Sequence, residues 1–186
     1  MRRVVLIAVS AALLAGCGEQ RTPAPDLLHA VEPDGFHTLS FADAGVSFEA
    51  PLNWQRLPAQ DQMVGGISSK TAVVAVWRYP RSEPLPADRD ELAQARDRLE
   101  ERIRLRDPTF ALDASRLARF DGARGIEVTG RQTISGRPYD VRSAHVFDEG
   151  AEIVVDAYAP VADFARVDGA VFVPLIASLT VTAPDA

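Results

Sequence analysis

The sequence contains one cysteine and three histidines among its 186 residues. The single thiol, that of Cys17, has no partner for an internal disulfide, so a disulfide-stabilised framework is excluded. The histidines His29, His37 and His145 do not form a His-x-x-x-His motif, and no Cys-x-x-Cys or acidic calcium-loop spacing occurs. We therefore expect neither a metal site nor a cofactor.

Long apolar runs are also scarce, and acidic residues outnumber basic ones. The longest apolar run, residues 4–14, covers eleven residues with Ser10 inside it, whereas a membrane-spanning helix needs about 20. The chain carries 20 basic and 26 acidic residues, a net charge of −6, which disfavours binding to nucleic acid. With 47% hydrophobic and 25% charged residues, the composition is typical of a globular domain.

Motifs for catalysis are missing as well. The sequence has no Gly-x-Ser-x-Gly nucleophile elbow, and Gly65-Gly66 lacks the Lys-Ser/Thr of a phosphate-binding loop. These glycines instead predict a bulge or a turn. We therefore expect that the protein is not an enzyme and has no catalytic residue.

The N-terminal residues have the pattern of an export signal, because two arginines precede the apolar run and small residues follow it. Leu14-Ala15-Gly16-Cys17 resembles the lipobox of bacterial lipoproteins, in which the cysteine thiol receives diacylglycerol and becomes the new N-terminus. The resemblance implies that residues 1–16 are a signal peptide and that Cys17 is lipidated. A plain secretory peptide cleaved elsewhere and an uncleaved anchor are the alternatives.

Lipidation at Cys17 predicts a protein held on a bacterial envelope membrane. We expect the periplasmic face of the outer membrane in a Gram-negative cell, or the outer face of the cell membrane in a Gram-positive one. Gly18 stands where Gram-negative lipoproteins retained at the inner membrane typically have aspartate. Cleavage before Cys17 removes two arginines, so the mature chain has a charge near −8.

Residues 17–35 are expected to form a lipidated tether. They contain three prolines and several charged residues but few apolar ones, and a flexible coil of this length reaches roughly 20–25 Å. We expect one domain over residues 36–182 that folds without the tether, followed by a tail over residues 183–186.

Alternation of apolar and polar residues predicts strands in the first part of this domain. Residues 39–50 form a hairpin around Gly45. Residues 63–69 and 71–79 form another extended pair. Because residues 73–77 are apolar at every position, we expect this strand to be covered on both faces.

A helix is predicted from Asp88 to a stop before Pro108. Asp88 and Glu91 resemble a capping box. Apolar residues then recur at intervals of three and four, at Leu92, Ala95, Leu99 and Ile103. The arginines on the other faces are interleaved with carboxylates, which favours a solvated face over a surface that lies on anionic lipid.

The second half of the domain reads as a β-meander and a helical region. Strands are predicted at residues 117–120, 126–134, 139–147 and 151–158. Turn sequences separate them, so neighbours should pair antiparallel. Helical spacing returns between Val161 and Leu179, where Gly169 and Pro174 predict a kink or two short helices. These elements predict an α+β fold, an antiparallel β-sheet flanked by two main helices.

The order of the elements is similar to that of a known family. The motif Gly-Val-Ser-Phe-Glu-Ala-Pro at residues 45–51, followed by Asn53-Trp54, precedes two strands, a long amphipathic helix, a meander and a terminal helix. This arrangement resembles the PsbP-like α/β/α sandwich and small bacterial lipoproteins of the LpqN and DcrB-like kind. The resemblance implies an exported or membrane-tethered accessory or scaffold protein with no shared catalytic centre.

Six charged residues on the meander are expected to form one patch, because they occupy alternate positions of successive strands. They are Glu127, Arg131, Asp140, Arg142, Glu152 and Asp156. The patch is either a solvated, ion-paired face, in which Arg131 and Arg142 are dispensable for folding, or a docking surface for another envelope protein or a polar ligand. Trp54 and Trp77 are expected to pack in the core or at its edge, with a role as recognition aromatics as the alternative. His145 shares a strand face with Tyr139, Val141 and Phe147, which favours a packed histidine with one hydrogen bond over a catalytic base.

The sequence therefore predicts a non-catalytic binding, accessory or scaffold module. A carrier of a small amphipathic ligand in a cleft between sheet and helix is the alternative, and a hydrolase comes third. An apolar-lined pocket would favour the carrier, a closed core with a charged face would favour the binding module, and a buried cluster of titratable groups would favour the enzyme.

Overall fold

The computed structural model describes residues 26 and 28–184. Its strands are β1 (Phe36–Phe41), β2 (Val46–Pro51), β3 (Gln55–Leu57), β4 (Met63–Ser69), β5 (Ala72–Pro80), β6 (Ala111–Phe120), β7 (Ala123–Ile134), β8 (Arg137–Asp148), β9 (Ala151–Pro160) and β10 (Thr180–Val181). Its helices are α1 (Arg89–Arg106), α2 (Val161–Val167) and α3 (Val173–Ala177), with a 3-10 turn η1 (Ala42–Ala44) and a π-helical segment η2 (Asp168–Phe172). The predicted α+β class is confirmed.

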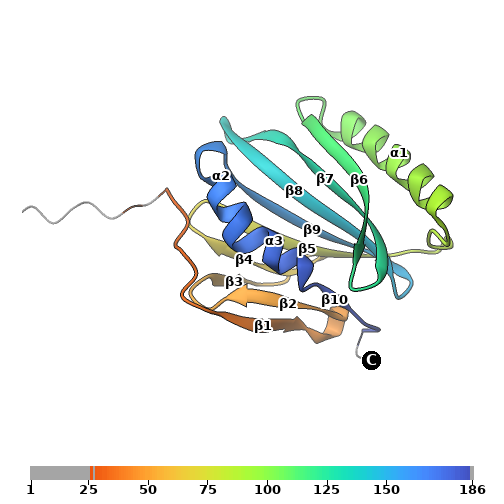
Figure 1. Ribbon diagram of the computed structural model, residues 1–186, viewed down its shortest axis with the longest axis horizontal. Helices are drawn as coiled ribbons and strands as arrows, with labels where there is room; N and C mark the ends of the chain where they lie inside the picture. Colours follow the sequence, from red (N-terminus) through yellow and green to blue (C-terminus); the bar gives the residue numbers. More distant parts are fainter. Residues whose placement is uncertain (1–25, 27, 185–186) are drawn as a thin grey trace, which may run out of the picture.

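The strands form two antiparallel sheets (Figure 1). The larger sheet has seven strands in the order β3-β4-β5-β9-β8-β7-β6, and the smaller has the order β1-β2-β10. The region α2–η2–α3 and the small sheet cover one face of the large sheet, whereas α1 lies against β6 and β7 on the opposite face (Figure 1). The result is a sandwich with the seven-stranded sheet as its middle layer.

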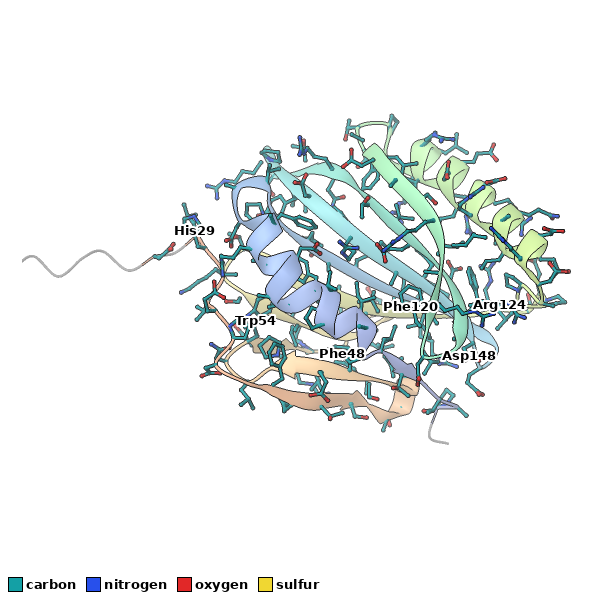
Figure 2. The ribbon with its side chains drawn as sticks, in the orientation of Figure 1. His29, Phe48, Trp54, Phe120, Arg124 and Asp148 are labelled. Carbon is teal, nitrogen blue, oxygen red and sulfur yellow. The ribbon has the colours of Figure 1, made fainter. Side chains whose placement is uncertain are left out.

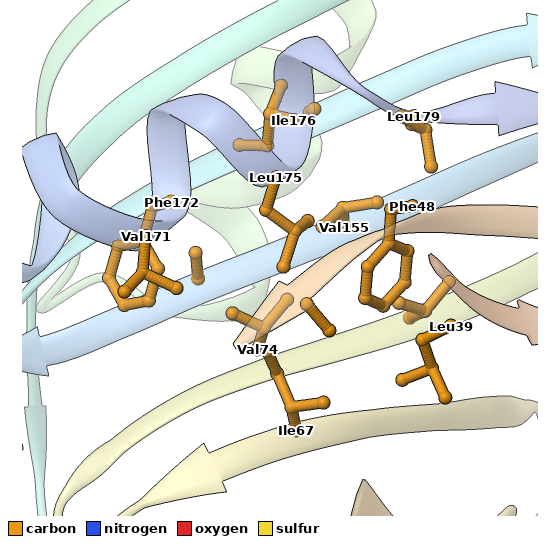
Figure 3. Packing of buried hydrophobic residues seen from close by; sticks show 14 of the residues in the cluster. Leu39, Phe48, Ile67, Val74, Val155, Val171, Phe172, Leu175, Ile176 and Leu179 are labelled. Atoms are coloured by element: carbon orange, nitrogen blue, oxygen red, sulfur yellow. The ribbon is translucent and has the colours of Figure 1, made fainter. Parts of the chain in front are cut away.

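The larger core lies between the seven-stranded sheet, the small sheet and the C-terminal helices. Phe172 and Leu175 point from the helices toward Val74 and Val155 of the sheet (Figure 3). Trp54 packs edge to face with Phe172 at 6.4 Å between ring centroids beneath these helices (Figure 2). The predicted core position of Trp54 is confirmed, since its exposed fraction is 6%.

The second core lies beneath α1, and the helix begins and ends as predicted. The Asp88 carboxylate accepts hydrogen bonds from the backbone N–H groups of Asp90 and Glu91, both at 2.9 Å. The Glu91 side chain in turn accepts the N–H of Ala87 at 2.7 Å, one residue before the N–H that a capping box uses. The four predicted stripe residues, Leu92, Ala95, Leu99 and Ile103, are buried against the sheet.

Strand β5 lies between β4 and β9, and its centre is covered on both faces as predicted. Val74 is fully buried on one face, and Ala75 is 5% exposed on the other. The predicted bulge also occurs, because the register of β4 shifts between Met63 and Gly65. A Cβ on Gly66 would lie 2.1 Å from the carbonyl oxygen of Val74, so only glycine fits there.

The meander strands are longer than predicted, and two-residue turns join them. Each turn has two residues with positive φ: Asp121 and Gly122, Ser135 and Gly136, and Glu149 and Gly150. This conformation matches the right-handed twist of the flanking strands. These turns therefore determine which residues of neighbouring strands lie opposite each other.

The C-terminal helical region has the predicted form of two short helices in series, α2 and α3. The π-helical turn η2, which was not predicted, joins them just before Pro174. Proline has no N–H to donate to the preceding turn, and both proline and π-helical turns are sites where helices become irregular.

The segment of residues 28–35, which was predicted to belong to the tether, packs against the domain. Ala30 is 5% exposed, and its N–H donates to the buried Asp163 carboxylate at 2.8 Å. Arg166 donates to the Ala30 carbonyl at 2.7 Å, and the Trp54 indole N–H donates to the Val31 carbonyl at 3.1 Å. These are backbone contacts, which leave no periodic pattern in the side chains. The packed part of the chain thus begins before residue 36.

Cys17, the signal peptide and the first part of the tether lie outside the described residues. Within the described part of the chain, no helix combines the length and apolar character needed to cross a bilayer.

Candidate functional site

A cavity of about 700 Å³ lies between α1 and the seven-stranded sheet. Its apolar wall consists of Leu99 and Ile103 from α1 and Val128, Val141 and Val154 from the sheet. The ring of Phe110, from the loop after α1, extends this wall. The volume is within the range of small-molecule sites.

Polar side chains of β8 and β9 form the floor of the cavity, and they are linked to one another. The Ser143 hydroxyl donates to Asp156 at 2.5 Å and lies 3.2 Å from Nε2 of His145. Nδ1 of His145 lies 2.9 Å from Glu152, which also pairs with Arg81 at 3.2 Å. Ser143, His145 and Glu152 are each less than 10% exposed. The floor is therefore a buried network in which each polar side chain has a partner.

The electrostatics of the floor favour an ionised Glu152. Burial alone would raise the pKa of Glu152, but the hydrogen bond with His145 and the electrostatic effect of His145, Arg81 and Arg102 outweigh it, so the pKa lies below its ordinary value. Burial and the charge of Asp156 raise the pKa of the Tyr79 hydroxyl in the same cavity. Glu152 is thus a hydrogen-bond acceptor, and Nδ1 of His145 donates to it.

The order Ser143, His145, Glu152 resembles the nucleophile, base and acid of a hydrolase, but the proton positions differ. A serine nucleophile must direct its hydroxyl proton to the histidine that removes it. Here the Ser143 hydroxyl donates to Asp156 at 2.5 Å, whereas Nε2 of His145 is 3.2 Å away. Backbone N–H groups around Ser143 serve the pairing of β8 with its two neighbours, so they are not free to stabilise an oxyanion. The arrangement is better suited to holding a ligand than to attacking one.

His145 lies on the predicted strand face but not in the predicted setting. It has two hydrogen-bonding neighbours, Ser143 and Glu152, and it lines a cavity. The predicted burial of His145 is confirmed, since it is 9% exposed, but it has two hydrogen-bonding neighbours where one was predicted. Trp77 is half-buried, and its indole N–H has no hydrogen-bond partner among the described residues.

The six charged residues predicted to share one patch lie on opposite faces of the sheet. Glu152 and Asp156 line the cavity beneath α1. The other four, Glu127, Arg131, Asp140 and Arg142, are on the face that carries α2 and η2. Because a two-residue turn joins β8 and β9, even-numbered residues of one strand lie opposite odd-numbered residues of the other. Glu152 and Asp156 therefore share a face with the odd-numbered residues of β8, and not with Asp140 and Arg142 as predicted. A docking role for the remaining four stays a prediction.

Arg142 is part of a charge network that ties the sheet to η2. Its guanidinium donates to both oxygens of Asp168, at 2.6 and 2.7 Å, and also to Glu127. Glu127 accepts a second arginine, Arg116, at 2.8 Å. The side chain of Arg142 is 15% exposed, whereas that of Arg131, which pairs with Asp140, is 52% exposed. The prediction that both arginines are dispensable is therefore unsupported for Arg142.

The sequence did not single out the cavity residues Arg81, Ser143, Arg102 and Arg106. Arg102 was assigned to a solvated helix face and Arg106 was not considered, yet both line the cavity. A signal was available in the helix itself, because Arg102 and Arg106 flank the buried Ile103 at positions next to the apolar stripe. Ser143 had no such signal, since its neighbours depend on strand register.

Comparison with known proteins supports the architecture. No protein-family model matches the sequence, and no curated protein matches it. Among solved structures, cyanobacterial PsbP (CyanoP) from Synechocystis superposes with a TM-score of 0.58 at 13% identity, covering 84% of this chain and all of its own.

Two further structures have the same architecture. LpqN, a Mycobacterium tuberculosis protein involved in cell envelope biogenesis, has a TM-score of 0.54 at 19% identity, covering 80% of this chain and 91% of LpqN. The Saccharomyces cerevisiae Ran-binding protein Mog1p has a TM-score of 0.54 at 7% identity, covering 80% of this chain and 96% of Mog1p. At these identities the similarity concerns the fold, and the chain has a PsbP-like α+β fold that it shares with LpqN.

Proposed function

We propose that the protein is a lipid-anchored module of a bacterial envelope that binds a small amphipathic ligand in the cavity between α1 and the seven-stranded sheet. One observation carries the proposal: a cavity of about 700 Å³ combines an apolar wall with a buried polar floor. Such sites typically bury most of a small ligand against apolar side chains and orient it with a few polar groups. This geometry favours the carrier over a scaffold with a closed core.

The envelope location rests on two arguments of different kinds. The first is Leu14-Ala15-Gly16-Cys17, whose resemblance to a lipobox predicts diacylglycerol on Cys17. The second is the fold, because LpqN, which shares it, is involved in cell envelope biogenesis. Two or more acyl chains give stable membrane attachment, so the ligand site would act close to a membrane surface.

A binding role also agrees better with the floor than hydrolysis does. The Ser143 hydroxyl donates to Asp156 at 2.5 Å and has a longer contact of 3.2 Å with His145, and the pairing of β8 on both sides engages the backbone donors beside it. The similar structures are cyanobacterial PsbP, a protein involved in cell envelope biogenesis and a Ran-binding protein. A non-catalytic accessory role fits all of these observations.

The proposal is tested by identifying what the cavity holds. The full chain is purified from membranes of cells that express it, and small molecules extracted from it are identified by mass spectrometry. A Val141→Phe variant, whose larger side chain projects into the cavity, serves as the control for lipids bound elsewhere. We expect an amphipathic molecule that is enriched in the wild type over a Val141→Phe variant with an intact melting transition. Equal extracts from both proteins would contradict the proposal.

A further inference from the structure

The arginines of α1 are used in two different ways. On the outer faces, Arg96 pairs with Asp97 at 2.8 Å and Arg104 pairs with Glu100 at 3.0 Å. Arg102 and Arg106 lie one helical turn apart at the cavity. Among the described residues, neither has a carboxylate within the 4.0 Å limit of an ion pair. The helix therefore presents two unpaired guanidinium groups at the edge of an apolar-walled cavity.

The negative charges of the cavity floor are already engaged. Glu152 is paired with Arg81 and hydrogen-bonded to His145, and Asp156 accepts the hydroxyl proton of Ser143. The cavity lining thus has three arginines against two carboxylates, although the chain as a whole has a charge of −6. Its cationic character is opposite to that of the protein and is concentrated on the α1 side.

This distribution also gives a ligand an orientation. The apolar wall, including Leu99, Ile103 and Val128, lies inside the cavity, whereas the side chains of Arg102 and Arg106 are exposed at its edge. The carboxylates of Glu152 and Asp156 on the floor would repel an anion that entered head first. An acidic head group therefore stays beside α1, with the apolar body inside.

We propose, building on the ligand-binding function above, that the ligand is an anionic amphiphile whose acidic head group is held by Arg102 and Arg106. Guanidinium groups form paired, charge-assisted hydrogen bonds with the oxygens of carboxylates, phosphates and sulfonates. The apolar body lies against Leu99, Ile103 and the valines of the sheet. The head group is the element that selects an acid over a neutral molecule of the same shape.

Two fluorescent probes of nearly the same apolar shape separate the head group from the cavity. 8-Anilinonaphthalene-1-sulfonate carries a sulfonate, and N-phenyl-1-naphthylamine is the same ring system without it. The full chain is held in phosphatidylcholine nanodiscs, and the signals of empty nanodiscs and of the Val141→Phe protein are subtracted. Binding that remains belongs to the cavity.

We expect the sulfonate to bind more tightly than the neutral probe. Arg102→Gln and Arg106→Gln should each weaken binding of the sulfonate by about fivefold or more, because a hydrogen-bonded ion pair is lost. Both variants should leave the neutral probe within about twofold, since its contacts are apolar. Arg104→Gln is the matched control, because it removes the same charge from the outer face of the same helix.

The other possible results separate a failure of the arginine site from a failure of the cavity as a ligand site. A loss of sulfonate binding in Arg104→Gln equal to that in Arg102→Gln would overturn the inference, because it would show a diffuse charge effect. Equal losses for both probes would overturn it too, since the arginines would then act through packing. If the neutral probe binds in the cavity and the sulfonate binds no more tightly, the acidic head group is contradicted while the proposed ligand site stands. If neither probe distinguishes wild type from Val141→Phe, the proposed ligand site itself fails.

Discussion

Replacement of Arg142 by alanine should destabilise the protein substantially, whereas replacement of Arg131 should not. The guanidinium of Arg142 makes three charged hydrogen bonds, two to Asp168 and one to Glu127. It joins β8 to the π-helical segment η2, which packs against the larger core through Phe172. Loss of this side chain therefore affects both the sheet and the helical layer.

The magnitude follows from what is left behind. Asp168 and Glu127 have side chains that are 16% and 10% exposed, so both are largely removed from water. Breaking a buried ion pair costs about 3–5 kcal/mol, mostly because of the charge left unpaired. Glu127 keeps its bond to Arg116, so we expect Arg142→Ala to lower the free energy of unfolding by about 2–4 kcal/mol.

Urea unfolding followed by the fluorescence of Trp54 and Trp77 measures this difference. Arg131→Ala is the matched control, since it removes the same side chain from the same face but from a pair in which the arginine is 52% exposed. Arg142→Lys should recover only part of the loss, because an ammonium group does not reproduce the two-point contact with Asp168. The double variant Arg142→Ala/Asp168→Ala should lose less than the sum of the single variants.

Two results would refute this reasoning. Equal stabilities of the Arg142→Ala and Arg131→Ala proteins would show that burial does not distinguish the two pairs. Additive losses in the double variant would show that Arg142 does not act through Asp168. Either result would support the solvated, ion-paired face predicted from the sequence.

A chain that begins at residue 36 should be about 2–4 kcal/mol less stable than one that begins at residue 26, because it lacks the backbone donor to buried Asp163 and the cover of Ala30. Equal urea midpoints would support a domain boundary at residue 36. The pKa of Glu152 is lower in the folded state than its ordinary value of 4.5, so its contribution to stability is complete above that value and is lost as the pH falls through the folded pKa. Glu152→Gln should therefore flatten the loss of stability on acidification below about pH 5, and an unchanged pH profile would contradict this assignment. Cys17→Ser should block lipid attachment and leave an uncleaved precursor, and mass spectrometry of an unmodified Cys17 thiol in the wild type would disprove the lipoprotein prediction.

Features set by local chemistry could be predicted from the sequence. The cap at Asp88 marks the start of α1, and the apolar residues that recur with the helical period of 3.6 residues up to Ile103 mark its length and its buried face. Glycine in the turns after β6, β7 and β8 predicted the meander, because these positions have positive φ. Each of these features depends on residues close together in the chain.

Features set by pairing across the chain could not be predicted in the same way. Whether Glu152 faces the cavity or η2 depends on a single residue of register between β8 and β9. The packing of residues 28–35 depends on backbone groups that meet Asp163 and Ser69, far away in the sequence. The cavity depends on the position of α1 over the sheet, which neither element specifies alone.

The polar floor explains why a cavity exists beneath α1. The apolar stripe of α1 packs with Ile126, Val128 and Phe147, whereas the same sheet face on β8 and β9 presents Ser143, His145, Glu152 and Asp156. Covering these groups with the stripe would place apolar atoms on a charged network, which is unfavourable. The helix thus packs on β6 and β7, and the space between it and the polar residues of β8 and β9 stays open as the cavity.

Such a polar floor lowers the stability of the fold relative to an apolar one, which a purely structural domain would avoid. Buried ion pairs are often less stabilising than apolar residues of the same volume, and the other face of the same strands shows the alternative, with Ala144, Val146, Ile153 and Val155 fully buried. The face that carries the C-terminal helices therefore has an apolar core together with the ion pairs of Arg142, whereas the α1 face is a hydrogen-bonded, cavity-forming surface. Departures from good packing are expected where a protein has a functional site. In the described part of the chain, the cavity that Arg102 and Arg106 border is a place where close packing is given up.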